Sequence, residues 1–166
     1  FFTPCYLRGT RIRVKGPVHF AEEKALRDVF DAQMRHEFFP VSNRQLAADL
    51  DYEALGETEL AVGRLAVRTQ FVNHTIRTLA YCLTENGRAV VYTGDHEPYY
   101  NLFAADKAPG AKEDAALFGD AEAAVRAAET RFVEFLRGAK LLLADGQYTP
   151  EEYRRSKRNW GHASWD

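Results

Sequence analysis

The chain has 166 residues, 46% of them hydrophobic and 28% charged, with a formal net charge of −2. This length allows one domain with a hydrophobic core of ordinary size, and we expect a single domain over residues 1–166. No apolar run approaches the ~20 residues that span a bilayer, so we expect no membrane partner. The small negative charge argues against general affinity for nucleic acids.

The two cysteines, Cys5 and Cys82, are too few for a disulfide framework or a zinc knuckle. Their predicted role is that of small apolar residues in a reducing compartment, which favours a cytoplasmic location.

Large aromatic residues lie at both ends of the chain, and neither end carries a polar tail. It opens on Phe1-Phe2-Thr3-Pro4 and stops at Ser164-Trp165-Asp166. Natural domain termini are usually exposed and polar. We therefore expect an internal segment of a longer domain, in which Phe1, Phe2 and Trp165 require partners.

The N-terminal third predicts two strands around a helix. Residues 11–15 alternate as a half-exposed strand, and residues 21–35 carry apolar side chains at helical spacing. Phe38-Phe39-Pro40-Val41 predicts an extended segment that fills a core or lines a cleft, of which we favour the core. Residues 45–55 predict a further strand or a short helix, of which we favour the strand.

Two hairpins follow. Residues 59–70 form two apolar runs around Gly63-Arg64, and residues 79–93 form two β-rich runs around Asn86-Gly87. Asn-Gly between such runs is a strong hairpin signal because both central residues of the turn take positive φ.

The C-terminal part mixes helix and strand. Residues 99–119 predict a loop, and residues 120–137 predict a helix that ends at Gly138. The unalternating run 141–144 predicts a strand buried on both faces, with layers covering the sheet on each side. Thr149-Pro150-Glu151-Glu152 predicts a helix start with a capping box. The basic residues after it form either a solvated face or a phosphate clamp, of which we favour the solvated face: Arg154, Arg155, Lys157 and Arg158. Such interspersed elements indicate one mixed α/β domain.

Two polar residues flank the second hairpin. His74 precedes its first strand and Asp95 follows its second. A two-residue turn makes the strands antiparallel, so we expect both residues at the same rim of the sheet. They would form half of a metal site there, or be a solvated loop histidine and a turn aspartate.

Asp145, at the end of the 141–144 strand, and His162 complete the candidate set. The apolar surroundings of both cysteines argue against a cysteine nucleophile. The chain has no Gly-x-Ser-x-Gly elbow and no glycine-rich phosphate loop. Metal-assisted hydrolysis with acid–base help from a histidine is the remaining interpretation.

Several motifs in order resemble the metallo-β-lactamase superfamily, in its phosphodiesterase-like branch of phosphoribosyl cyclic phosphodiesterase and tRNA 3′-processing endonucleases. They are Asn73-His74, the Asn86-Gly87 hairpin, Tyr92-Thr93-Gly94-Asp95-His96-Glu97-Pro98, Leu142-Leu143-Ala144-Asp145-Gly146-Gln147-Tyr148-Thr149 and Trp160-Gly161-His162-Ala163-Ser164. The resemblance implies an αββα sandwich, incomplete in this chain, with two divalent metal ions, zinc or manganese, at one edge of the sheets.

The resemblance also implies roles for the four residues. His74 would bind metal, and Asp95 would bridge both ions. His162 would be the general acid that protonates the leaving group, and Asp145 would orient it. The implied reaction is hydrolysis of a small-molecule or nucleotide-like phosphodiester by a metal-bridging hydroxide.

The chain departs from the family at two places. The His-x-His-x-Asp-His motif and the last metal-binding histidine are absent, and neither His19 nor His36 is spaced to replace them. A longer native chain or a second chain, as in a homodimer, would complete the site, or the chain would be inert. The alternatives are the same fold acting on a thioester, lactone or β-lactam, and a non-catalytic binding or regulatory module. His96 is predicted either to reach substrate or to be a solvated turn residue.

Overall fold

The computed structural model describes residues 2–17, 25–101 and 115–166. The chain divides into two compact units, Phe1–Gly56 and Glu57–Asp166. All four candidate site residues belong to the second unit. The expectation of a single domain over residues 1–166 stays a prediction. No helix of the described ranges combines the length and apolarity needed to cross a membrane.

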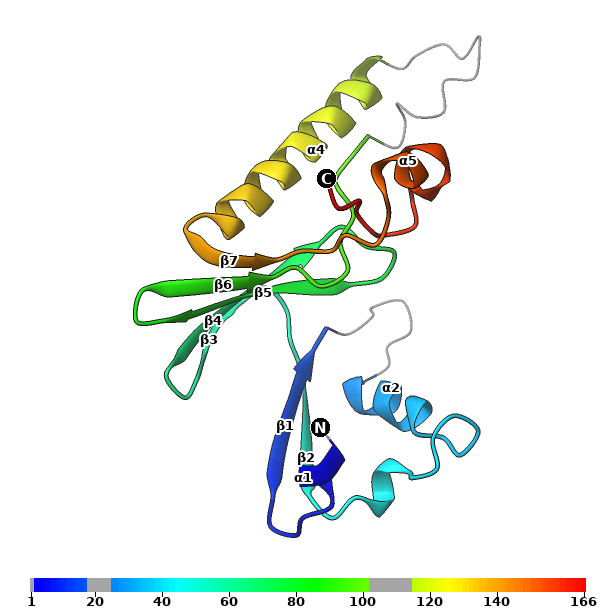
Figure 1. Cartoon of the computed structure of the whole chain (residues 1–166), viewed down its shortest axis with the longest axis vertical. Coiled ribbons are helices and arrows are strands. Elements are labelled where there is room, and N and C mark those ends of the chain that lie inside the picture. The colour runs from blue at the N-terminus through cyan, green and yellow to red at the C-terminus, as the bar shows by residue number, and fades with distance from the viewer. Residues whose placement is uncertain (1, 18–24, 102–114) are drawn as a thin grey trace. The chain divides into compact units, whose positions relative to one another are not determined.

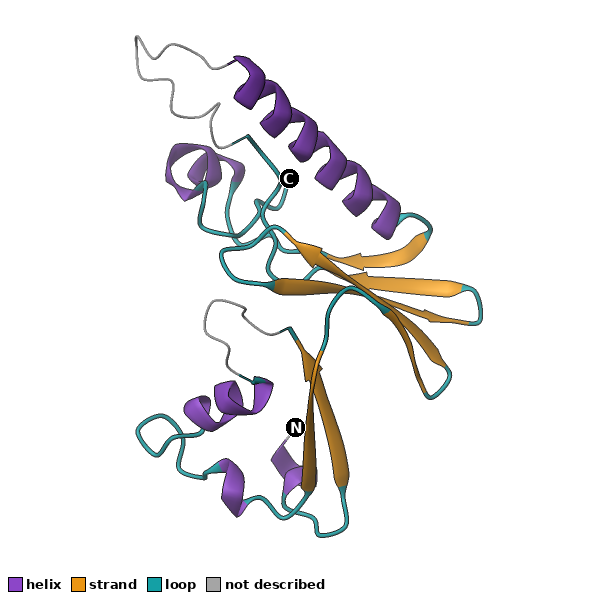
Figure 2. Cartoon of the chain, turned by 180° about the vertical axis from the view of Figure 1, so that it is seen from behind, coloured by secondary structure: helices purple, strands orange, loops and turns teal. Residues whose placement is uncertain are grey.

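The first unit pairs two parallel strands beside a helix (Figure 2). Its elements are α1 (Phe2–Cys5), β1 (Arg11–Gly16), α2 (Leu26–Gln33), a 3₁₀ turn η2 (Asn43–Gln45) and β2 (Asp49–Ala54). The Phe30 ring on α2 packs against Tyr52 on β2, with ring centroids 5.3 Å apart. Arg13 on β1 lies opposite Asp51 on β2, and their side chains form an ion pair with 3.4 Å between Arg13 Nε and Asp51 Oδ2. Such exposed pairs add little stability.

Three sequence predictions for this unit need correction or restriction. The strand expected from residue 45 begins at Asp49, because the Ser42 backbone N–H donates to the Gln45 side chain and stabilises η2. The helix expected over residues 21–35 spans Leu26–Gln33, and residues 18–24, with His19, lie outside the described part. Phe38 does not fill a core.

Phe38 is 75% exposed. A tight turn follows α2, in which the backbone N–H groups of Phe38 and Phe39 both donate to the Arg35 carbonyl, at 2.9 and 2.8 Å. This turn directs the Phe38 side chain into solvent and leaves Phe39 half-buried. The prediction of a packed extended segment was wrong because the turn is stabilised from the preceding helix.

The second unit is built on a five-stranded sheet with the order β3-β4-β5-β6-β7. The strands are β3 (Glu59–Val62), β4 (Leu65–Val72), β5 (Thr78–Glu85), β6 (Arg88–Tyr92) and β7 (Ala139–Leu143). The first four are antiparallel in sequence order, and β7 pairs with β6 in parallel. Asn86 and Gly87 have φ of 51° and 72°, so the predicted hairpin turn is confirmed.

Helix α4 (Ala115–Leu136) lies over one face of this sheet (Figure 1). Phe135 packs into a cluster with Val72, Ala80, Cys82 and Val91. The helix begins five residues earlier than residue 120, so the end of the predicted loop is helical; residues 102–114 of that loop lie outside the described part. The predicted stop is confirmed, with Gly138 at φ 79°.

Strand β7 is present but not buried on both faces as predicted. Leu141, Leu142 and Leu143 are 51%, 44% and 50% exposed. Within the described unit β7 is an edge strand with one neighbour, β6, so its side chains lack flanking residues on the other side. An unalternating apolar run does not reveal how many neighbours the strand has.

After β7 the chain forms α5 (Pro150–Glu152) and a π-helical turn η3 (Tyr153–Lys157). The capping box is confirmed, because the Glu152 backbone N–H donates to Thr149 Oγ1 at 3.2 Å and the Glu152 carboxylate accepts from the Thr149 N–H. The basic residues beyond it are largely exposed, as predicted: Arg154, Arg155 and Arg158. Lys157 is half-buried over the Trp160 ring.

The strand directions explain the position of the site. Because β6 and β7 are parallel, their carboxyl ends lie at the same edge of the sheet. Strand β5 is antiparallel to β6, so its amino end, and the β4–β5 connection before it, lie at that edge too. His74 is in this connection, while Asp95 and Asp145 follow β6 and β7.

Candidate metal centre

His74 is held in one orientation by the backbone. Its side chain is 8% exposed. Its Nδ1 lies 2.6 Å from the Gly161 carbonyl oxygen. A carbonyl can only accept, so Nδ1 carries the proton and, in the neutral imidazole, Nε2 keeps its lone pair. A metal-binding histidine commonly donates its second N–H in this way.

Asp95 faces the free nitrogen of His74. Its Oδ2 lies 3.9 Å from His74 Nε2, and the carboxylate is 61% exposed. Gly94 turns the chain out of β6 with φ 64°, and a Cβ there would lie 3.2 Å from Thr78 Cγ2. The prediction that His74 and Asp95 meet at one rim of the sheet is confirmed.

His162 and Asp145 form a second pair. His162 Nδ1 donates to Asp145 Oδ2 at 2.8 Å, with side chains 20% and 7% exposed. Asp145 Oδ2 also accepts the His96 backbone N–H at 3.0 Å, and Oδ1 accepts that of Gln147 at 3.2 Å. The carboxylate is thus fixed by the loops after β6 and β7. The His162 tautomer that it favours carries its proton on Nδ1 and leaves Nε2 free.

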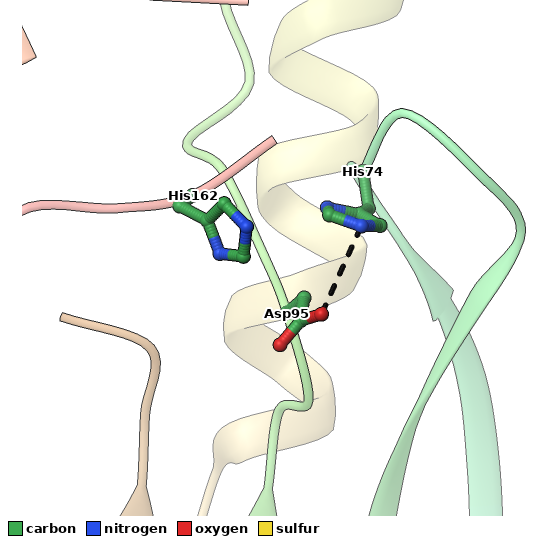
Figure 3. A group of neighbouring side chains, drawn as sticks. All are labelled: His74, Asp95 and His162. Atoms are coloured by element: carbon green, nitrogen blue, oxygen red, sulfur yellow. Dashed lines mark ion pairs between the residues drawn. The ribbon is translucent and has the colours of Figure 1, made fainter. Parts of the chain in front are cut away.

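The residues His74, Asp95 and His162 converge (Figure 3). One ligand atom of each lies within 4.8 Å of the others, and the imidazole rings of the two histidines have centroids 5.2 Å apart. Figure 3 shows the two rings on either side of the Asp95 carboxylate. Nitrogen and carboxylate donors in this number suit a divalent ion with an open position, as in catalytic zinc sites.

The donor set therefore fits one metal ion. A second ion would need donors beyond those that the described residues bring to this point. The same geometry brings His162 within reach of an ion held by His74 and Asp95. Its role as a proton donor rather than a ligand stays a prediction, as do the roles of the other three residues.

One residue at this edge was missed by the sequence interpretation. Glu97 is 3% exposed and accepts hydrogen bonds from Tyr153, Asn159 and Gly161. It belongs to the Gly94-Asp95-His96-Glu97-Pro98 motif, but nothing in its local pattern distinguishes a buried glutamate from a solvated turn residue. A cavity of about 220 Å³ lies beside it, bordered also by His74 and Tyr99.

His96 matches neither of its predicted roles. Its ring stacks on Phe132 of α4, with centroids 4.4 Å apart and planes 24° apart. Its Nε2 is buried and has no hydrogen-bond partner among the described residues. Burial lowers the pKa of His96 below its ordinary value. The negative charges of Asp145 and Glu97 act in the opposite direction, but their effect is smaller.

Replacing His96 by phenylalanine should stabilise the metal-free protein. The ring stack with Phe132 is kept, and an unpaired buried nitrogen that costs roughly 1–3 kcal/mol is removed. We expect the free energy of unfolding, measured in urea at pH 7.5, to rise by about 1 kcal/mol.

The gain should grow at lower pH. The folded-state pKa of His96 lies below its unfolded value of about 6.5, so the unfolded state binds the proton first and wild-type stability is lost as pH falls from about 6.5 through the folded pKa. His96→Phe lacks this component. The control is His36→Phe at an exposed histidine, which should leave the free energy of unfolding at pH 7.5 nearly unchanged. A His96→Phe protein that is less stable than the wild type, and whose stability depends on pH as the wild type's does, would contradict the interpretation of His96 as a buried histidine with an unpaired nitrogen.

No family model and no curated protein sequence matches the chain. The fold is similar to that of the metallo-β-lactamase fold protein YhfI from Bacillus subtilis, with a TM-score of 0.50, 14% identity and 93% of this chain covered. It is also similar to the short form of human tRNase Z, with a TM-score of 0.52, 16% identity and 94% covered. The chain spans 44% and 53% of these solved chains, about half their length.

Proposed function

The chain has a metallo-β-lactamase-like fold, as its motifs predicted, and from this premise we propose that its protein is a metal-dependent hydrolase of phosphodiester bonds. The observation that carries the proposal is the second histidine. His162, oriented by a buried carboxylate, lies beside the His74 and Asp95 donors. The name of the similar human protein, tRNase Z, says that it cleaves tRNA, whose linkages are phosphodiesters.

In this proposal His74, through Nε2, and Asp95 hold divalent metal, zinc or manganese, with two ions in the completed site. When bound, such ions polarise phosphoryl oxygens and lower the pKa of a bound water. The missing donors would come from a further segment of the native chain or from a second copy of it. Cys5 and Cys82 are buried and are not joined to each other, which supports the proposed cytoplasmic location.

His162 and Asp145 supply the proton. A protonated His162 would donate from Nε2 to the departing oxygen, while Asp145 accepts the Nδ1 proton and keeps the ring in place. An alkoxide leaving group requires this proton, whereas a thiolate does not. The pair therefore favours a small-molecule or nucleotide-like phosphodiester over a thioester.

The proposal is tested on the full-length protein with matched substrates. After treatment with a chelator, the protein should hydrolyse bis(p-nitrophenyl) phosphate only when zinc or manganese is returned. A thioester, a lactone and a chromogenic β-lactam should be poorer substrates under the same conditions.

Three outcomes would contradict the proposal. Phosphodiester hydrolysis that survives chelation would show that the reaction does not require a metal ion. Faster turnover of the thioester, lactone or β-lactam would replace the substrate class. A protein that takes up no metal and hydrolyses none of the four would be a non-catalytic module.

A further inference from the structure

Glu97 is a buried carboxylate that binds one loop at several points. Its Oε1 accepts from Tyr153 Oη at 2.9 Å and from the Asn159 backbone N–H at 2.8 Å. Its Oε2 accepts from the Gly161 backbone N–H at 2.8 Å. Burial, followed by the hydrogen bond to Glu97, raises the pKa of Tyr153, which keeps the phenol protonated as a donor. Both carboxylate oxygens are therefore engaged.

The loop that Glu97 holds has an unusual backbone. Asn159 has φ 70° and Gly161 has φ 84°, conformations that side-chain-bearing residues rarely adopt. A Cβ on Gly161 would lie 2.8 Å from His74 Cε1, so the loop approaches the imidazole closely. Such a conformation persists where the surroundings over-determine it. The Glu97 carboxylate is the group that binds the backbone on both sides of Trp160.

The same loop controls both histidines. The Gly161 N–H is bound by Glu97, and the Gly161 carbonyl accepts the His74 Nδ1 proton. The next residue is His162. The backbone of Glu97 also reaches the His74 segment, because its N–H donates to the Asn73 carbonyl at 2.7 Å and its carbonyl accepts from Asn73 Nδ2 at 3.1 Å.

We propose that Glu97 is the positioning residue of the candidate metal centre: its carboxylate fixes the Asn159–Gly161 backbone and thereby sets the His74 tautomer and the location of His162. This inference deepens the proposed function and rests on it for the metal-binding readout. Glu97 acts through the loop, because both of its carboxylate oxygens are engaged by Tyr153, Asn159 and Gly161.

The role requires a carboxylate. Glutamine has the same shape, but one of its two terminal atoms is an NH₂ group that cannot accept. Because Asn159 and Gly161 donate to different oxygens of Glu97, one backbone N–H would face another donor in Glu97→Gln. The loop should then move, and His74 Nδ1 should lose its fixed acceptor.

The test uses Glu97→Gln in the full-length protein, with two readouts. Without metal, ¹⁵N NMR of the imidazoles should show one Nδ1–H tautomer for His74 in the wild type and a tautomer mixture in the variant. With Zn²⁺ or Mn²⁺ alone as the probe, calorimetry should show affinity reduced 10–100-fold, the usual cost of losing an outer-shell partner.

Two controls isolate the loop contacts. Tyr153→Phe removes one hydrogen bond to Glu97 and leaves both backbone bonds, so the His74 tautomer should be unchanged. Glu134→Gln removes an exposed carboxylate paired with Arg137 on α4 and should change neither readout. If Glu97→Gln kept both the wild-type tautomer and the wild-type metal affinity, the proposal would be overturned.

The wild-type protein provides a measurement that needs no variant. The amide protons of Asn159 and Gly161 should be protected from hydrogen exchange in the metal-free state. Rapid exchange of both would overturn the proposal even if Glu97→Gln failed to fold. A wild-type protein that binds no metal but shows protected amides and the Nδ1–H tautomer would instead reject the proposed function and leave the positioning role of Glu97 intact.

Discussion

Replacing Asp95 by alanine should abolish divalent-metal binding and hydrolysis together. Asp95 supplies the sole carboxylate of the three converging donors among the described residues. Its side chain is 61% exposed, so its removal should leave the packing of the sheet unchanged. Calorimetric titration with Zn²⁺ and phosphodiester turnover are the measurements, and thermal unfolding of the metal-free protein should match the wild type.

The matched control is Asp51→Ala, at an exposed aspartate of β2 that pairs with Arg13. This variant loses a surface ion pair of little energetic value and should retain metal binding and activity. Full metal occupancy in Asp95→Ala would show that this carboxylate is not a ligand. Loss of activity with metal retained would place Asp95 in contact with substrate instead.

Replacing His162 by alanine should slow turnover by roughly 10²–10⁴-fold, the usual range for a lost general acid or base. Metal content should stay nearly unchanged, because His74 and Asp95 keep their donors. The loss should shrink for substrates with a weakly basic leaving group such as nitrophenolate, which needs no proton.

Asp145→Asn gives a matched, milder change. It keeps the imidazole but weakens the hydrogen bond to His162 Nδ1, so it should show the same dependence on the leaving group with a smaller loss. The result that would reassign His162 as a ligand is loss of metal from His162→Ala. Equal slowing of good and poor leaving groups would make it a structural residue.

The sequence by itself determined the elements that carry the candidate metal centre. Asn86-Gly87 predicted the β5–β6 turn, because asparagine and glycine readily adopt the positive φ that both central residues of such a turn require, and both do so here. Because this turn makes β5 and β6 antiparallel, it placed His74 and Asp95 at the same rim of the sheet. The stop at Gly138 and the cap at Thr149 were predictable for the same reason, since each depends on a few neighbouring residues.

Where local sequence patterns were ambiguous, the tertiary structure decided the outcome. Strand β7 carries the apolar run that predicts two covered faces, yet its leucines are about half exposed, since among the described strands β7 lies at the edge of the sheet beside β6 alone. Two further residues have surroundings that differ from those expected. Phe38 is exposed to solvent, and the His96 ring is stacked on Phe132 of α4. Burial depends on which distant segment covers a residue, and local periodicity does not report that.

Only the tertiary structure could assign a role to Glu97. Its carboxylate meets the Gly161 N–H across 64 residues of sequence, and the His74 ring meets the Gly161 carbonyl across 87. In sequence Glu97 is an acidic residue in a turn, where charged side chains are usually solvated. It becomes a buried acceptor because two loops at one edge of the sheet close over it, and hydrogen bonds of this kind are set by the fold as a whole.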